Sequence, residues 1–270
     1  MAFFPYYPYN KLDYLEYLSE QKQDDARDGF INMGADNSFY FSGSTNQSVN
    51  GQAGADFITI EGSSRDTVFG GSGNDNIDTG AGNDTVNGSA GQDYLRGDEG
   101  DDRIVGGDAF DDVHGNMGND TVSGGLGGDW VVGGRDNDVL YGDEGGDVVY
   151  GNLGNDTLDG GVGNDVMRGG QADDILQGSW GDDWLAGDRG NDTISGGGGA
   201  DTFHTWSQAG LDRVTDFNRV DGDRVNVLPG SSYSVSQVGA DTVIDMGGGN
   251  QMILVGVSMS SLTPGWIFTA

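Results

Sequence analysis

Aspartate returns at every ninth residue over about half of this chain of 270 residues. The stretch GGSGNDNIDTGAGNDTVNGSAGQDYLR, residues 70–96, carries Asp75, Asp84 and Asp93 at that spacing, and an aliphatic residue follows each aspartate two positions later. Carboxylates are hard oxygen ligands of the kind that calcium prefers. A regular row of them beside a regular apolar position therefore predicts a repeated cation site built next to a repeated strand.

Each repeat reads approximately G-G-x-G-x-D-x-U-x, where U is apolar, and 16 copies follow one another without an insertion. The candidate calcium ligands are the sixth-position aspartates Asp66, Asp75, Asp84, Asp93, Asp102, Asp111, Asp120, Asp129, Asp138, Asp147, Asp156, Asp165, Asp174, Asp183, Asp192 and Asp201. The turn glycines that we expect to contribute backbone oxygens are Gly71, Gly73, Gly80, Gly82, Gly118, Gly154 and Gly163. Looser copies of the repeat precede the array around Val49 and Ile58, with one residue inserted before Val68.

The repeat predicts an all-β fold. Its last three residues form a minimal strand with U facing inward, because side chains alternate between the two faces of a strand. Its glycine-rich start must reverse the chain. Two repeats then make a coil of about 18 residues, and the array forms a right-handed parallel β-roll. The aspartates fall into two rows with neighbours about 4.8 Å apart. One calcium ion in each gap gives about 14 ions. Departures such as Ser64 and Thr79, which replace repeat glycines, predict weaker sites nearby.

Composition supports a neutralising cation. The net charge is −32, with 52 glycines and only 34% hydrophobic residues, which would otherwise predict disorder. So acidic a chain is not expected to bind nucleic acid. It has no cysteine and no apolar run long enough to span a membrane. The N-terminus, MAFFPYYPYNKLDYLEY, has no basic region or aliphatic core, so we expect no N-terminal secretory signal.

Three regions are predicted along the chain. Residues 1–33 are non-repetitive and include a short amphipathic helix between Asn10 and Gly29. Residues 34–204 form the repeat array. Residues 205–270 lose the repeat and contain strand-like runs, which we interpret as a C-terminal β-cap.

The array resembles the RTX (repeats-in-toxin) family of Gram-negative bacteria, and the segment after it resembles serralysin-type C-terminal regions. That resemblance implies calcium binding, export through a type I secretion machinery, and an uncleaved C-terminal signal that includes GWIFTA. It implies a secreted or cell-surface protein that folds in extracellular calcium, so that metal-binding energy becomes folding energy.

The sequence predicts a protein that is not an enzyme. It contains neither H-E-x-x-H nor G-x-S-x-G, and its two histidines, His114 and His204, lie far apart at outward strand positions. A non-catalytic relative of an RTX exoenzyme stays as an alternative, since modified repeats line substrate grooves in some RTX epimerases.

An apolar stripe on one sheet predicts an interface. Its residues are Tyr94, Trp130, Val132, Val148, Tyr150, Val166 and Trp184, with turn tips Leu126, Val162 and Trp180 expected nearby. The first hypothesis is a structural protein that self-assembles into an oligomer or filament through this stripe. The second is an accessory module that binds surface polysaccharide on exposed aromatic rings. Covering of the stripe by the aromatic N-terminus is the third possibility.

Overall fold

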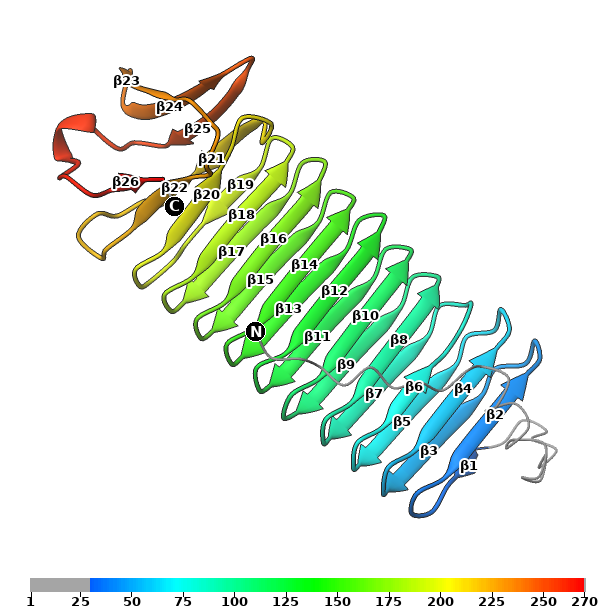
Figure 1. Ribbon diagram of the computed structural model, residues 1–270. Coiled ribbons are helices and arrows are strands. Elements are labelled where there is room, and N and C mark those ends of the chain that lie inside the picture. The colour runs from blue at the N-terminus through cyan, green and yellow to red at the C-terminus, as the bar shows by residue number, and fades with distance from the viewer. Residues whose placement is uncertain (1–29, 270) are drawn as a thin grey trace.

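The computed structural model describes residues 30–269, which wind into a long roll of two β-sheets (Figure 1). The 14-stranded sheet holds, in spatial order, β1 (Phe30–Asn32), β3 (Ser48–Ala53), β5 (Thr67–Ser72), β7 (Thr85–Ala90), β9 (Arg103–Asp108), β11 (Thr121–Leu126), β13 (Val139–Glu144), β15 (Thr157–Val162), β17 (Ile175–Trp180), β19 (Thr193–Ser195), β21 (Leu211–Val214), β25 (Asn250–Leu254), β24 (Asp241–Gly247) and β23 (Ser234–Val238). The 12-stranded sheet holds β2 (Ser38–Ser42), β4 (Phe57–Glu61), β6 (Asn76–Asp78), β8 (Tyr94–Glu99), β10 (Asp112–Met117), β12 (Trp130–Arg135), β14 (Val148–Leu153), β16 (Val166–Gln171), β18 (Trp184–Arg189), β20 (Thr202–Thr205), β22 (Arg224–Val227) and β26 (Ile267–Phe268). From β1 to β22, successive strands therefore alternate between the sheets.

The register of the strands confirms the 18-residue coil. Thr67 pairs with Thr85 in the 14-stranded sheet, and Tyr94 pairs with Asp112 in the 12-stranded sheet, so each coil repeats after two nonapeptides. The offset is 19 residues where Ser48 pairs with Thr67, because one residue is inserted before Val68. Within the array all of these neighbours are parallel.

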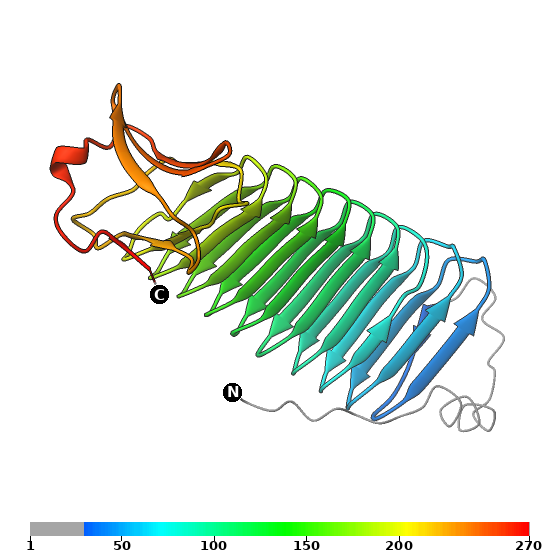
Figure 2. The ribbon, with the colours of Figure 1, turned by 45° about the horizontal axis from the view of Figure 1, so that its top comes forward.

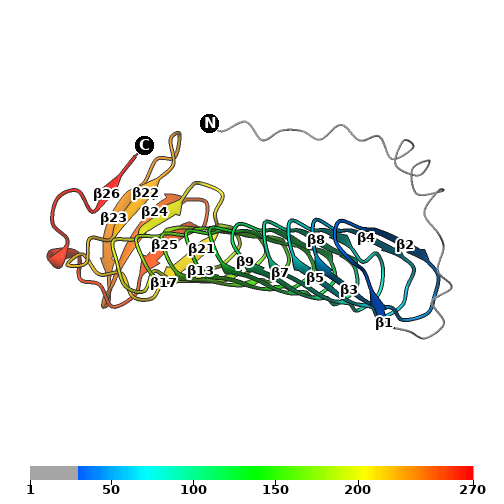
Figure 3. The ribbon, with the colours of Figure 1, turned by 90° about the horizontal axis from the view of Figure 1, so that it is seen from below.

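The core is a double ladder of eighth-position side chains between the two sheets. Figure 3 shows the two sheets as closely stacked layers. Every U residue from Val68 to Phe203 is almost completely buried. Each buried aliphatic side chain contributes about 1.5–3 kcal/mol. The same contact recurs in every coil, so the repeat itself supplies the apolar surface that the overall composition lacks.

The strands are longer than the three residues predicted. Most run for six residues, as in β11 (Thr121–Leu126), because the first three residues of the next repeat continue the parallel pairing. The sheets also cross both predicted domain boundaries. Strand β1 (Phe30–Asn32) lies before residue 34 and pairs with β3, while β21 and β22 continue the two sheets beyond residue 204. The predicted N-terminal helix lies outside the described residues.

The C-terminal region closes one end of the roll, as Figure 2 shows. Strands β23, β24 and β25 form an antiparallel extension of the larger sheet. The rings of Phe203, Phe217 and Trp266 also pack there, Phe203 and Phe217 tilted at a centroid distance of 5.9 Å and Phe217 and Trp266 edge-on at 6.3 Å. These three rings are buried and join the hydrophobic core, so the C-terminal region covers the apolar end of the double ladder. Among residues 30–269 the one helix is the 3-10 turn η1 (Met259–Ser261), and no helix is long and apolar enough to cross a membrane.

Candidate calcium-binding ladders

The sixth-position aspartates form two continuous hydrogen-bonded ladders, one at each turn edge of the roll. The backbone N–H of Asp75 donates to Oδ1 of Asp93 at 2.7 Å, and the N–H of Asp93 donates to Oδ1 of Asp111 at 2.8 Å. The second row repeats the contact from Asp84 to Asp102 at 2.8 Å. One carboxylate oxygen of each aspartate therefore ties its coil to the preceding one.

The other carboxylate oxygen, Oδ2, is buried without a hydrogen-bond donor in 15 of the 16 predicted aspartates. A buried, unpaired carboxylate oxygen is costly unless a proton or a cation compensates it. The orphan oxygens recur coil after coil, and that regularity points to a ligand that is taken up equally at every turn.

Backbone oxygens converge on the same places. At Gly124, a Cβ atom would lie 2.6 Å from Oδ2 of Asp129 and 2.9 Å from the carbonyl oxygen of Gly142, one coil later. Two oxygens thus face the small space that only a glycine leaves open. Within residues 30–269 no three His, Cys, Asp or Glu side chains gather into a metal cluster, so backbone carbonyls have to complete any cage. Calcium accepts such carbonyls readily, and the donor set fits it.

The predicted turn glycines stand at repeat positions with a left-handed backbone, which glycine adopts without strain. All seven have a positive φ, and at Gly163, with φ of 146°, a Cβ would also collide with the carbonyl oxygen of Gly145 in the preceding coil. The turns of neighbouring coils therefore touch backbone to backbone. This close stacking brings their carbonyl oxygens to the aspartate ladders.

Burial sets the proton affinity of the ladders. It raises the pKa of Asp102, Asp111, Asp138 and Asp174 from 3.8 to about 8, and carboxylates in the adjoining coils add to the rise. The N–H bond to Oδ1 opposes it, since that bond favours the ionised form. Without a cation, the folded roll would hold many of these carboxyls protonated at neutral pH.

Two substituted positions alter the ladder locally. Ser64 donates its hydroxyl to Oδ2 of Asp66 at 3.1 Å, so this aspartate, alone among the 16, has no orphan Oδ2. Thr79 lies buried in place of a repeat glycine, and its Oγ1 is 3.4 Å from the carbonyl oxygen of Gly97. Both sites have protein hydroxyls where the regular repeats leave oxygens facing open space.

Three further aspartates extend the ladders beyond the predicted set. Asp56 precedes Asp75, Asp212 accepts from the N–H of Asp192 at 3.4 Å, and Asp223 accepts from the N–H of Asp201 at 3.1 Å. Each stands in a D-x-U triplet, and a search of the sequence for that triplet would have identified all three as ladder residues. The wider spacing at the ends of the array hid them. Asp223 ends its ladder, because its own N–H donates to the backbone oxygen of Asn218 at 3.3 Å, and the N–H of Asn218 donates to its Oδ2 at 2.7 Å.

The model of the RTX calcium-binding nonapeptide repeat matches seven segments of the chain, most of which overlap: residues 62–95, 96–131, 123–158, 141–176, 150–184, 159–194 and 177–210. Together they cover more than half of it. The chain belongs to the RTX repeat family. Proteins of this family bind calcium through these repeats, and the ladders are where the RTX roll offers oxygens for it.

Among solved structures, the RTX roll is similar to the extracellular lipase LipA from Serratia marcescens, with 18% identity and a TM-score of 0.29. That match covers 74% of this chain and 45% of the lipase, so the chain spans less than half the length of that enzyme. A subunit of the mannuronan C5-epimerase from Azotobacter vinelandii is 23% identical, with a TM-score of 0.22 over 60% of this chain and 80% of that one. No curated protein matches the chain.

The predicted apolar stripe is contiguous on the 12-stranded face of the RTX roll. Trp130, Val148, Val166 and Trp184 pair in successive strands, and Val132 lies beside Tyr150 in the next column. Asp112 and His114 of β10 separate Tyr94 from them, as predicted. All seven side chains are half-buried. Trp184 stacks on the buried His204 at 3.9 Å, and Trp130 meets Tyr150 edge-on at 6.3 Å.

The turn tips lie on the other sheet, contrary to prediction. Leu126, Val162 and Trp180 end strands β11, β15 and β17 of the 14-stranded sheet and are 48%, 55% and 71% exposed. Because strands alternate between sheets every nine residues, positions 18 residues apart share a face, and these three belong with Tyr141 and Ile175. Within the repeat array, the most exposed large apolar side chains thus lie on the sheet opposite the stripe.

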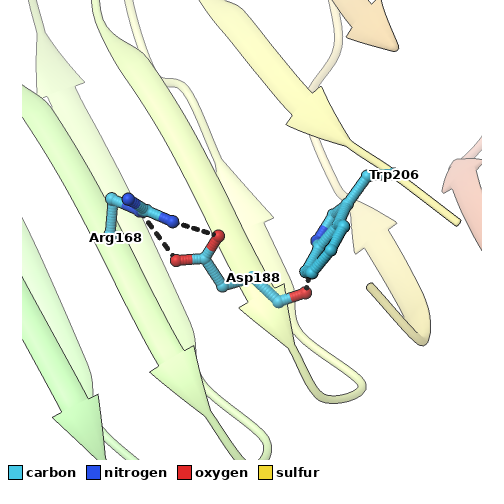
Figure 4. Close-up of polar contacts among 3 residues, drawn as sticks. All are labelled: Arg168, Asp188 and Trp206. Atoms are coloured by element: carbon cyan, nitrogen blue, oxygen red, sulfur yellow. Dashed lines mark hydrogen bonds and ion pairs between the residues drawn. The ribbon is translucent and has the colours of Figure 1, made fainter. Parts of the chain in front are cut away.

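A groove of about 490 Å³ borders the stripe near the C-terminal end. Arg168 holds Asp188 with two 2.8 Å hydrogen bonds, and the indole N–H of Trp206 donates to the backbone oxygen of Asp188 at 3.3 Å (Figure 4). Arg189 lies over the ring of Trp206 at 5.9 Å. These contacts fasten the segment after β20 to the RTX roll.

Proposed function

We propose that this RTX protein is secreted, folds when it meets extracellular calcium, and acts as a structural, self-assembling protein at the cell surface or in an extracellular matrix. The observation that carries the calcium step is the row of buried Oδ2 atoms without donors. In low calcium the carboxylates repel one another and the chain stays open. In high calcium about 14 ions in the two rows would offset most of the charge.

Export follows from the same chemistry. A chain of net charge −32 that cannot fold without metal remains unfolded in a low-calcium cytoplasm and can pass through a type I secretion machinery. The Ca²⁺ ions would be held by the ladder aspartates and the carbonyl oxygens of the glycine turns. When bound, they supply charge neutralisation rather than any reaction.

The calcium step is tested by circular dichroism of the full chain titrated with calcium after treatment with chelator. We expect little β-structure in chelator and a cooperative gain as calcium rises. A chain that is already fully β-structured at neutral pH in chelator would refute the calcium-dependent folding.

Self-assembly is supported by the apolar side chains exposed on the 14-stranded face and by the stripe on the 12-stranded face, since exposed apolar patches of this kind mark interaction sites. Analytical ultracentrifugation in saturating calcium tests it. We expect oligomers that grow with protein concentration. A protein that stays monomeric at high concentration would refute the assembly.

A second candidate is binding of surface polysaccharide. The groove near Tyr150, Gln171 and Trp206 favours it, because it combines aromatic rings with planar hydrogen-bonding side chains. A glycan array probed with the calcium-loaded protein and with Trp206→Ala tests this. Binding that the variant loses supports it, and an array without any signal counts against it.

We further propose that the protein is not an enzyme. Both histidines have structural partners: Nε2 of His114 lies 2.7 Å from Asp112, and His204 is buried against Trp184. Burial lowers the pKa of His204 to about 4, which makes it a poor proton carrier at neutral pH. An enzymatic activity lost on replacing Tyr150 and Trp184 by alanine would favour kinship with an RTX exoenzyme instead.

A further inference from the structure

The last residues of neighbouring strands form a short row with a single negative charge on the 14-stranded sheet. Leu126 pairs with Glu144, and Glu144 pairs with Val162, so the three side chains follow one another in adjacent coils. All three are exposed. We call this apolar–acid–apolar sequence the acidic row.

The 12-stranded sheet carries a matching row of opposite charge. Met117 pairs with Arg135, and Arg135 pairs with Leu153, again in adjacent coils and at the last position of each strand. These side chains are exposed as well, Met117 at 39% and Leu153 at 40%. This is the basic row, an apolar–base–apolar sequence.

The two rows have the same spacing. Both follow the parallel strand separation of about 4.8 Å, so Glu144 can face Arg135 while the apolar side chains on either side meet in pairs. Each three-residue row is symmetric about its charge, but its surroundings are not, because Asp108 adjoins Leu126 and Glu99 adjoins Met117. Two rolls that run in opposite directions match best, since rolls that run in the same direction would place these two acids opposite each other. Complementary charge flanked by apolar contacts is what fixes register at protein interfaces.

The surroundings reinforce the charge difference. The acidic row borders a groove of about 520 Å³ whose lining includes Asp108, Asp143 and Asp159 and no arginine, lysine or histidine. Towards the C-terminus, the basic row leads along the same strand position through Gln171 to Arg189, beside the Arg168 groove, whereas on its other side Met117 adjoins Glu99. Since the protein as a whole is strongly acidic, a surface with several arginines is unusual on it.

We propose that a second copy of this chain is the partner of both surfaces, the acidic row of one copy docking on the basic row of the next. This inference rests on the self-assembly proposed above and names its contact. The rows belong to opposite sheets of one roll, as Figure 3 lets the reader follow. Such a contact joins two different surfaces and leaves one of each free, which produces an open array rather than a closed dimer.

Charge exchange tests the contact. Arg135→Glu leaves a copy with acid on both rows, and Glu144→Arg leaves a copy with base on both. We expect each variant alone, in saturating calcium and low salt, to lose assembly, with at least a tenfold rise in the concentration needed. An equimolar mixture of the two should assemble again, because every contact then pairs an acid with a base.

Matched controls are Arg213→Glu and Glu61→Arg, which change the same charges at exposed positions outside the rows; Glu61 ends its strand as Glu144 does. Both should assemble like the unchanged protein. Circular dichroism in calcium checks that all four variants fold.

The outcomes separate the two proposals. A monomeric unchanged protein would refute self-assembly itself. An unchanged protein that assembles, together with single variants that assemble equally well or a mixture that does not recover, would overturn the row-to-row contact and leave assembly to another surface. Retention of a monomeric protein on an acidic polysaccharide column, lost in Arg135→Glu, would likewise overturn it in favour of a glycan partner.

Discussion

The backbone N–H of Asp111 donates a 2.8 Å hydrogen bond to Oδ1 of Asp129, one coil further along the roll. The two oxygens of this carboxylate therefore differ: Oδ1 accepts the hydrogen bond that connects the coils, while Oδ2 is buried without a donor. Each ladder aspartate therefore has a structural oxygen and an oxygen left for a cation. Neighbouring coils are coupled through it, so the roll should gain or lose structure over several coils at once.

Calcium should fold the chain at concentrations where magnesium does not. The ladders offer carboxylate and carbonyl oxygens in a flexible, glycine-rich setting, whereas magnesium needs a tight octahedron and sheds its water reluctantly. Circular dichroism of parallel titrations measures the difference. Equal folding by both ions would contradict the assignment of the ladders to calcium.

Removing one orphan oxygen should weaken calcium-dependent folding. Asp129→Asn keeps an acceptor for the N–H of Asp111 but removes the charge at Oδ2. We expect a higher calcium midpoint, since a site filled at 100 times its Kd contributes about 2.7 kcal/mol. Asp66→Asn is the matched control, because the Ser64 hydroxyl already bonds its Oδ2. Equal shifts in the two variants would mean that the orphan oxygens are not the metal ligands.

Acid should replace calcium as a folding agent. In chelator, folding raises the pKa of Asp102 and Asp138 from 3.8 to about 8, so it favours their protonated forms. This contribution to stability is complete below about pH 3.8 and is lost as pH rises through about 8. Circular dichroism in chelator should show β-structure appearing as pH falls from 8 towards 4. Saturating calcium should reverse the trend and hold the roll folded at neutral pH.

Adding one methyl group to a stacked turn should be costly. Gly163→Ala forces a side chain onto a φ of 146° and against the carbonyl oxygen of Gly145. We expect a loss of about 3 kcal/mol or more in the free energy of unfolding in calcium. Gly239→Ala, with φ of 62° and no atom within 4 Å of the new Cβ, should cost only about 1 kcal/mol. Urea denaturation of both variants compares them.

The spacing of the repeat predicted most of the fold. A nine-residue period with one apolar position per repeat is enough to place Val68 through Phe203 in a buried double ladder, and the register of 18 confirms it. Strand length was not predictable from that period, because pairing of the glycine segment depends on neighbouring coils being already stacked.

The site was predictable where the repeat is regular and not elsewhere. The sequence alone does not show that the hydroxyl of Ser64 donates to Oδ2 of Asp66. Nor does it show that Asp212 joins a ladder by bonding Asp192, 20 residues away. The exposed tips were misplaced for a geometric reason. Trp180 comes close to Trp184 in sequence, but they belong to β17 and β18 on opposite sheets.

Because the strands of the array alternate between the two sheets, two residues lie on the same face when an even number of repeats separates them and on opposite faces when the number is odd. Deleting a nonapeptide upstream of both Arg135 and Glu144 would leave the two residues on opposite sheets. A nine-residue insertion between them would keep the core pattern and both aspartate rows, but would bring Glu144 to the face that carries Arg135. Gain or loss of one repeat between them can therefore move two opposite charges from opposite faces of the roll to the same face without any substitution.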